Sequence, residues 1–325
     1  MPFAFFTMIV LQMSKLQDHL NAVFAETDIY LSKDLAAKIG GRLEHSQLVD
    51  EWNIAPRFSL AYKLKNQAQV SFAYGIFYQK PESQYQPATG AGYAQATHYI
   101  LQYQRMVNMR TFRTEVFYKG YDHLFKTGAN GNNRDVAINN NGSGFAKGVE
   151  FFWRDKKSLK NVDYWVSYSL LDTERDYLNF PFAMTPAFAA RHTASLVIKK
   201  FSMPWKTSFN LSYTHATGRP WYQLKYDQVQ GKYNVADAGR TISFNNLGFS
   251  VNYLPNLGKQ NKKSFIVWVL SMSNVLGQKQ VFNYSYGTVT DNKQPIGPTS
   301  KRFAFVGCFI SFGVDRTQDA INNNL

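Results

Sequence analysis

Short stretches of this chain alternate apolar and polar side chains at every second position. Side chains of a β-strand point to opposite faces with a period of two, whereas those of a helix repeat every 3.6 residues. The alternation therefore predicts strands with one apolar and one polar face. In the stretch 163–172, DYWVSYSLLD, one face carries Tyr164, Val166, Tyr168 and Leu170, and the other carries Trp165, Ser167, Ser169 and Leu171.

The same reading along the whole chain predicts about thirteen strands. They span residues 17–31, 35–46, 55–65, 68–79, 95–107, 110–122, 143–155, 162–174, 188–201, 205–218, 241–254, 264–277 and 300–314. The apolar face is clearest in the sets Phe58, Leu60, Tyr62; Val70, Phe72, Tyr74, Ile76; Phe209, Leu211, Tyr213; and Phe303, Phe305, Phe309. The opposite face carries Arg57, Ser59, Lys63; Ser71, Ala73, Gly75; and Ser208, Asn210, Ser212. The stretch 264–272 is apolar on both faces.

The connections between these strands alternate between short and long. The short ones fall at 32–34, 66–67, 107–109, 156–161, 202–204 and 255–263, and the long ones at 47–54, 80–94, 123–142, 173–187, 219–240 and 278–300. Such alternation is typical of an up-and-down transmembrane β-barrel, in which all turns at one end are short and all loops at the other are long. We therefore predict an all-β, antiparallel barrel wall.

Composition supports a barrel and weakens the rival classes. Aromatic residues make up 16% of the 325 residues while the mean hydropathy is only −0.34, which suits a wall with aromatic girdles at the membrane interfaces. No apolar run approaches the roughly 18 residues of a transmembrane helix. The net charge of +14 suggests a nucleic-acid partner. The basic residues, however, are dispersed over turns and not gathered on one surface, so we predict no nucleic-acid partner. The single cysteine, Cys308, excludes a disulfide framework.

The number and direction of the strands indicate an incomplete barrel. The first and the last predicted strands run in the same direction, whereas single-chain bacterial barrels have even strand numbers. We divide the chain into an N-terminal stub (1–16), the C-terminal part of a larger barrel (17–314) and a polar tail (315–325).

Several segments resemble TonB-dependent outer-membrane receptors of the Bacteroidota type, over residues 17–325. They are NIAPRFSLAYKLKNQAQVSFAYGIFYQKPE (53–82), GSGFAKGVEFFWRD (142–155), YWVSYSLLDTERDY (164–177), SYTHATGRPWY (212–222) and SMSNVLGQKQVFNYSY (271–286). The resemblance implies a barrel of about 22 strands in a Gram-negative outer membrane, an N-terminal plug, and energy from the TonB complex for uptake of a siderophore, haem, cobalamin or oligosaccharide. No plug or TonB box precedes the first strand, so we expect a fragment that is not competent for energised transport alone. The alternative is a passive porin-like or surface barrel.

The sequence offers no catalytic constellation, and we predict neither an enzyme nor a bound cofactor or metal. His123 and His215 lie at predicted loop edges and are candidates for contact with a ligand, although isolated loop histidines more often contact solvent. Asp172, Glu174 and Asp176 form either a solvated rim or a site for a cation. Charges cost about 2 to 4 kcal/mol on the lipid face at the membrane midplane. We therefore expect six charged residues to face the lumen or the plug: Arg57, Arg113, Glu115, Lys119, Glu150 and Arg154.

Overall fold

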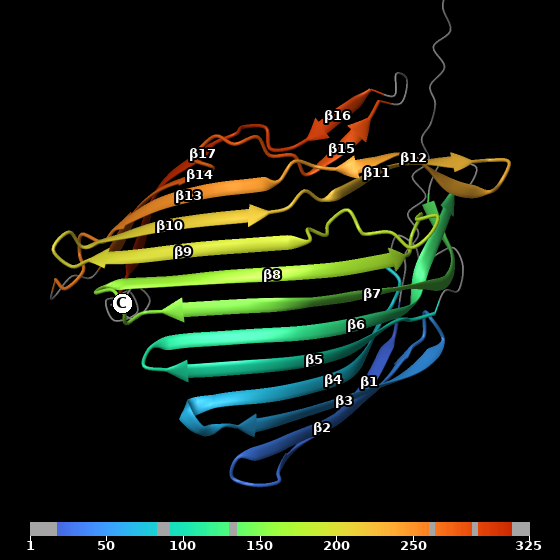
Figure 1. The fold of residues 1–325 in the computed structure, drawn as a ribbon, viewed down its shortest axis with the longest axis horizontal. Coiled ribbons are helices and arrows are strands. Elements are labelled where there is room, and N and C mark those ends of the chain that lie inside the picture. The colour runs from blue at the N-terminus through green and yellow to red at the C-terminus, as the bar shows by residue number, and fades with distance from the viewer. Residues whose placement is uncertain (1–17, 83–91, 130–134, 260–263, 288–291, 314–325) are drawn as a thin grey trace, which may run out of the picture.

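Thirteen antiparallel strands form one curved sheet, shown in Figure 1. The computed structural model describes residues 18–82, 92–129, 135–259, 264–287 and 292–313. In spatial order the strands are β1 (Leu20–Tyr30), β2 (Leu35–Ser46), β3 (Glu51–Lys63), β4 (Ala68–Gln79), β5 (Ala94–Val107), β6 (Arg110–Ala129), β7 (Asp135–Asp155), β8 (Val162–Asp176), β9 (His192–Ser202), β10 (Thr207–Ala216), β13 (Phe244–Tyr253), β14 (Ser264–Ser273) and β17 (Phe303–Phe312). Each strand pairs with its neighbours in this order, as in an up-and-down barrel wall. The thirteen predicted segments each overlap one of these strands, so the predicted fold class is confirmed.

Three of the predicted long loops contain both strands of an antiparallel pair, beyond the short extensions of single wall strands into the others. The stretch 123–142 is largely the continuation of β6 and β7. The predicted loop 219–240 contains the hairpin β11 (Pro220–Asp227) and β12 (Lys232–Arg240), and 278–300 contains the hairpin β15 (Asn283–Tyr286) and β16 (Lys293–Ile296). Glycine, asparagine and proline are turn-forming residues, and their abundance in these stretches concealed the pairing. The predicted stub 1–16 and tail 315–325 lie outside the described residues.

The short connections that the structure describes in full are turns at one end of the sheet, on the left in Figure 1. Between β5 and β6 the two residues Asn108 and Met109 have φ angles of 50° and 59°. Two positive φ values in a two-residue loop are the signature of the turn that matches the twist of a β-hairpin. A single 3-10 turn, η1 (Lys65–Gln67), joins β3 to β4. Both extra hairpins and the described parts of the long connections lie at the opposite end.

The register assigns every strand residue to one of two faces. Phe58 lies opposite Tyr74, and Leu60 opposite Phe72, which defines the apolar face. Arg57 lies opposite Gly75 on the second face, called the polar face here. These two names are used for the whole sheet below.

The predicted apolar set Phe303, Phe305 and Phe309 is assigned to the wrong face. In β17, Phe305 lies opposite Ser271 and Phe309 opposite Val267, whereas Val306 lies opposite Leu270. Leu270 lies opposite Val251, which belongs to the apolar face together with Phe209. The three phenylalanines are therefore on the polar face. Because β14 and β17 are apolar on both sides, alternation within either strand could not decide between the faces.

The sheet has two edges among the described residues, β1 and β17, and the barrel is not closed. Figure 1 shows both edge strands curling away behind the middle strands. Both run from the long-connection end to the short-turn end, because eleven antiparallel strands lie between the first and the last. In the described part of the chain, no helix is long and apolar enough to cross a membrane.

Candidate functional site

The polar face carries a pair of carboxylates at its centre. Glu115 of β6 lies directly opposite Glu150 of β7, and both line a hollow of about 190 Å³ together with Arg113. Like charges directly opposite each other on neighbouring strands are destabilising. Within the described residues neither carboxylate forms an ion pair. The pair can therefore bind a cationic group that approaches from the polar face.

Two basic side chains of β6 on the same face lie against aromatic rings. The guanidinium carbon of Arg113 is 5.6 Å from the centre of the Phe152 ring, and Lys119 Nζ is 5.1 Å from that of Phe117. Such cation–π contacts hold a charged group without neutralising it. Both cations thus remain able to interact with a group that fills the space above the sheet.

Arg57 sits in a second hollow of about 210 Å³, between β2 and β5. Its guanidinium carbon is 5.1 Å from the centre of the Phe77 ring. A Cβ atom on Gly75, the residue opposite Arg57, would lie 3.1 Å from that ring and 3.6 Å from the Arg57 side chain. The glycine therefore leaves the room in which Arg57 and Phe77 stack.

Arg154 has a partner within the wall itself. Its Nε and Nη2 atoms donate hydrogen bonds to the two carboxylate oxygens of Asp163, at 2.9 and 2.6 Å. The neighbouring Asp155 is 2% exposed and accepts hydrogen bonds from Arg110 and from both backbone and hydroxyl groups of Ser158. These contacts organise the short turn between β7 and β8, and Arg154 has a structural role there.

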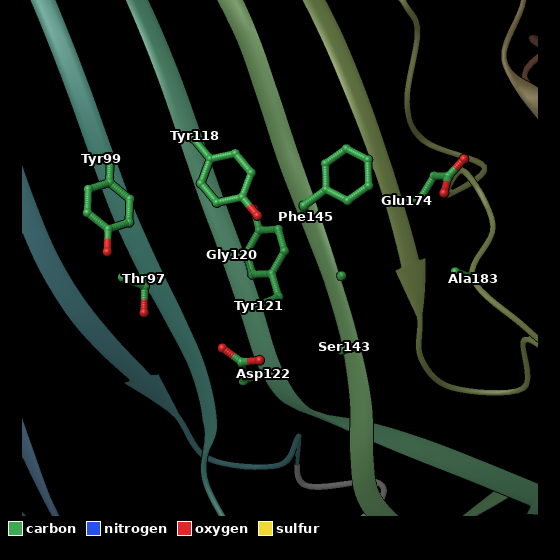
Figure 2. A pocket seen from close by; sticks show the side chains of 11 residues that line it. Thr97, Tyr99, Tyr118, Gly120, Tyr121, Asp122, Ser143, Phe145, Glu174 and Ala183 are labelled. Atoms are coloured by element: carbon green, nitrogen blue, oxygen red, sulfur yellow. The ribbon is translucent and has the colours of Figure 1, made fainter.

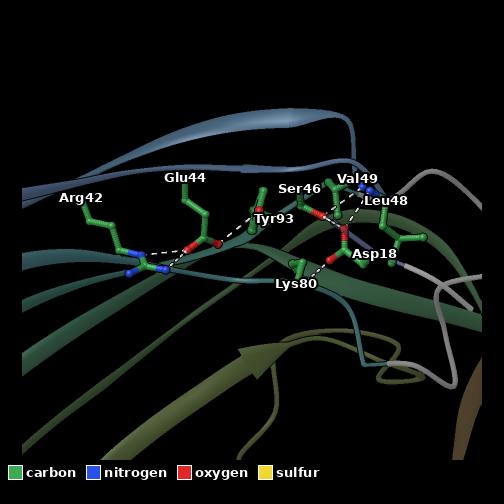
Figure 3. A network of polar contacts seen from close by, with 8 residues as sticks. All are labelled: Asp18, Arg42, Glu44, Ser46, Leu48, Val49, Lys80 and Tyr93. Carbon is green, nitrogen blue, oxygen red and sulfur yellow. Dashed lines mark hydrogen bonds and ion pairs between the residues drawn. The ribbon is translucent and has the colours of Figure 1, made fainter. Parts of the chain in front are cut away.

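A polar network ties the polar face to the long-connection end, as shown in Figure 3. Arg42 donates to Glu44 at 2.6 and 2.8 Å, and the Tyr93 hydroxyl donates to the other oxygen of Glu44 at 3.3 Å. Burial raises the pKa of Tyr93 to about 12, and the charge of Glu44 adds to the rise. Asp18 accepts hydrogen bonds from Lys80 and Ser46, and the bond from Lys80 is the main cause that lowers the pKa of Asp18. The network fastens the segment before β1 to the loop after β4.

The two candidate histidines are not brought together. His123 is exposed in β6, at a break in register with a φ of 55°. His215 lies in β10 on the apolar face, where its Nδ1 is 2.9 Å from Oδ1 of Asn245. In the described segments no group of three or more His, Cys, Asp or Glu side chains is arranged to hold a metal ion. Their role as ligand contacts stays a prediction.

The predicted acidic cluster is divided between different contacts. Asp172 pairs with Lys147 at 3.3 Å on the apolar face, and Asp176 pairs with Lys126. Glu174 lines a hollow of about 490 Å³ near the long-connection end. Figure 2 shows its aromatic wall, formed by Tyr99, Tyr118 and Phe145 from three neighbouring strands. An aromatic band at this height of the apolar face fits a membrane–water interface.

The register brings all six predicted lumen-facing charges, Arg57, Arg113, Glu115, Lys119, Glu150 and Arg154, onto the polar face. Sequence reasoning missed their partners. Nothing in the linear pattern couples Arg154 to Asp163 or sets Glu115 against Glu150, because these contacts join residues of different strands. The alternation of side chains along each strand was the only available signal for these positions. It identifies the face on which a residue lies but not its neighbour on the next strand.

Comparison with known proteins identifies the family of this wall. A family model described as TonB dependent receptor-like, beta-barrel, matches residues 10–263. A search of curated proteins finds no match. Among solved structures, the outer membrane transporter YddB from Escherichia coli is 12% identical with a TM-score of 0.66, over 90% of this chain and 45% of that one. The siderophore receptor PirA from Acinetobacter baumannii is also 12% identical with a TM-score of 0.66, over 93% and 47%.

A third solved structure, the pyoverdine outer membrane receptor FpvA from Pseudomonas aeruginosa PAO1, is 10% identical with a TM-score of 0.65, over 90% of this chain and 42% of that one. The chain thus spans less than half the length of each of these structures. The family match extends over most of the described sheet, from β1 to β13. This chain belongs to the family of TonB-dependent receptors, and its strands form part of an outer-membrane β-barrel.

Proposed function

We propose that this chain forms part of the wall of an outer-membrane receptor that actively imports a scarce solute, such as a siderophore, haem, cobalamin or an oligosaccharide. The observation that carries the proposal is the Glu115–Glu150 pair on the polar face. In a barrel the apolar face meets lipid, so the polar face lines the lumen. The two opposed carboxylates offer acceptors for cationic groups of a plug that fills the lumen.

The plug is the partner that this arrangement fits. Cationic side chains of a plug would neutralise Glu115 and Glu150 and relieve their repulsion, and Arg57, Arg113 and Lys119 would accept its acidic or aromatic groups. A plug held by a few charge-assisted contacts can be released by a pull from the TonB complex. We infer that uptake needs this plug in addition to the 13 strands of the wall, and that the receptor is of the Bacteroidota type.

Uptake by the native bacterium tests the proposal. Cells that carry the full receptor, wild type or with Glu115→Gln and Glu150→Gln, receive labelled ferric siderophore, haem, cyanocobalamin or maltooligosaccharide. We expect one of these probes to accumulate in wild-type cells and a protonophore to abolish the accumulation. The double variant should lose about tenfold in uptake rate, which corresponds to roughly 1.4 kcal/mol in the activation free energy of uptake.

The matched control is Glu174→Gln, which removes a carboxylate from the apolar face of the neighbouring strand β8. It should leave uptake unchanged. Ferric siderophores are the first probe, because the similar solved structures include siderophore receptors. If probes of similar size all enter at comparable rates, insensitive to the protonophore and to the double substitution, the wall is a passive porin and the proposal is wrong.

A further inference from the structure

The two hairpins inserted between the wall strands meet at the long-connection end of the sheet (Figure 1). The ring of Trp221 in β11 lies 5.3 Å from that of Tyr284 and 6.2 Å from that of Tyr286, both in β15. The Tyr286 hydroxyl donates a 2.9 Å hydrogen bond to Asp237 in β12. Trp221 is only 5% exposed. Segments about sixty residues apart in the sequence thus share one aromatic and acidic cluster.

A lysine ammonium group occupies the centre of this cluster. Lys293 Nζ lies 3.2 Å from the centre of the Trp221 ring and 4.5 Å from that of Tyr284. It is also 3.9 Å from Oδ2 of Asp237. Two aromatic rings and a carboxylate around one ammonium are the elements with which proteins recognise alkylammonium ligands. We call Trp221, Tyr284 and Asp237 the cage.

The backbone is shaped to hold the cage. Gly239 lies opposite Trp221 across the β11–β12 hairpin. A Cβ atom at Gly239 would lie 2.8 Å from the indole ring, which is closer than van der Waals contact allows. The glycine therefore leaves the room beside β12 that the indole ring occupies. The site is formed by the main chain as well as by the three side chains.

We propose that the cage is a binding site for an alkylammonium group, and that Lys293 is a tethered occupant for which a ligand competes. The lysine is attached at the edge of the cage by a flexible stem and is 35% exposed, so its head group can move into solvent while Tyr284 stays in place. A tethered group competes at an effective concentration of the order of millimolar. The cage then favours a ligand that carries a primary or quaternary ammonium group.

Chemical rescue tests the site directly. The probe is n-butylammonium, and saturation-transfer NMR measures its dissociation constant for the full receptor in detergent. Removal of the tethered competitor by Lys293→Ala should tighten binding of the probe at least tenfold relative to wild type. In the Lys293→Ala background, Trp221→Leu or Asp237→Asn should remove this gain. Lys232→Ala, on the same β11–β12 hairpin but outside the cage, should bind the probe as wild type does.

Lys293→Gln keeps the length of the stem and covers the case in which the alanine disorders the hairpins. It too should bind the probe more tightly than wild type. Equal affinity in wild type and in both Lys293 variants, or a gain that survives Trp221→Leu, would overturn the proposal. Because the readout is binding in detergent, the cage can fail while active uptake stands, and the reverse is also true.

Discussion

At the scale of single residues, the contribution of a charge depends on what lies opposite it. Arg154 and Asp163 form a two-pronged contact in which Asp163 is only 5% exposed. Lys147 and Asp172 meet at 3.3 Å with both side chains 55% exposed. Exposed ion pairs contribute little, since water screens them and ordering costs entropy. A carboxylate that satisfies two guanidinium donors out of solvent contributes more.

This difference gives the first prediction for stability. Asp163→Ala leaves Arg154 half-buried with two unpaired donors, so we expect the free energy of unfolding to fall by about 1 to 3 kcal/mol. Asp172→Ala should change it by no more than about 1 kcal/mol. Urea-induced unfolding of the full receptor in lipid vesicles measures both. Equal effects of the two substitutions would show that the Arg154–Asp163 contact is not formed in the membrane.

The residues of the polar face also show what the alternation within a strand can predict and what it cannot. Alternation within one strand is enough to place Arg57 or Glu115 on a face, because neighbouring positions point in opposite directions. It says nothing about the neighbour on the next strand. The Glu115–Glu150 repulsion depends on the register between two strands, and the cage around Lys293 depends on contacts between two distant hairpins. No local sequence pattern encodes either.

At the scale of elements, the thirteen wall strands could be predicted because most have one lipid-facing side. Apolar residues at every second position are required there, and the requirement is visible in the sequence. The hairpins β11–β12 and β15–β16 lie outside the membrane wall and have no such requirement. Their strands are short and lie among turn-forming residues, so the sequence resembled a loop. In β17 the strand itself could be predicted, but its two faces could not be told apart because both are apolar.

The two faces of β10 give the second prediction. Leu211 lies on the apolar face opposite Phe249, and the next residue, Ser212, lies on the polar face opposite Gly248. Both are near the middle of the strand, Thr207–Ala216. Leu211→Arg should therefore destabilise the membrane-inserted state by about 2 to 4 kcal/mol. Ser212→Arg should have little effect, because the lumen is polar and Gly248 leaves room.

Refolding into lipid vesicles, followed by urea titration, compares these two variants of the full receptor. The same substitution at adjacent positions keeps composition and strand propensity equal, so the comparison isolates the face. Similar losses for both variants would mean that the assignment of the faces by register is wrong.

At the scale of the whole molecule, strand direction determines how the wall can close. β1 and β17 run in the same direction. Direct pairing of the two would be parallel, which an up-and-down barrel does not contain. Antiparallel closure therefore needs an odd number of additional strands between them. A total of about 22 strands, as in outer-membrane transporters, meets this condition, since nine more strands would be added to the thirteen described here.

Cys308 provides the test of closure. It is the single cysteine of the chain and is exposed on β17. Trp268 lies opposite it on β14, and a disulfide forms only when two Cα atoms are within about 7 Å. In the full receptor, Trp268→Cys should therefore form a disulfide with Cys308 under mild oxidation. Val23→Cys, Ala25→Cys and Thr27→Cys on β1 should not, because the intervening strands separate β1 from β17. Rapid cross-linking of a β1 cysteine to Cys308 would mean that the thirteen strands close on themselves, and that the wall of this receptor has an arrangement that antiparallel pairing alone cannot give.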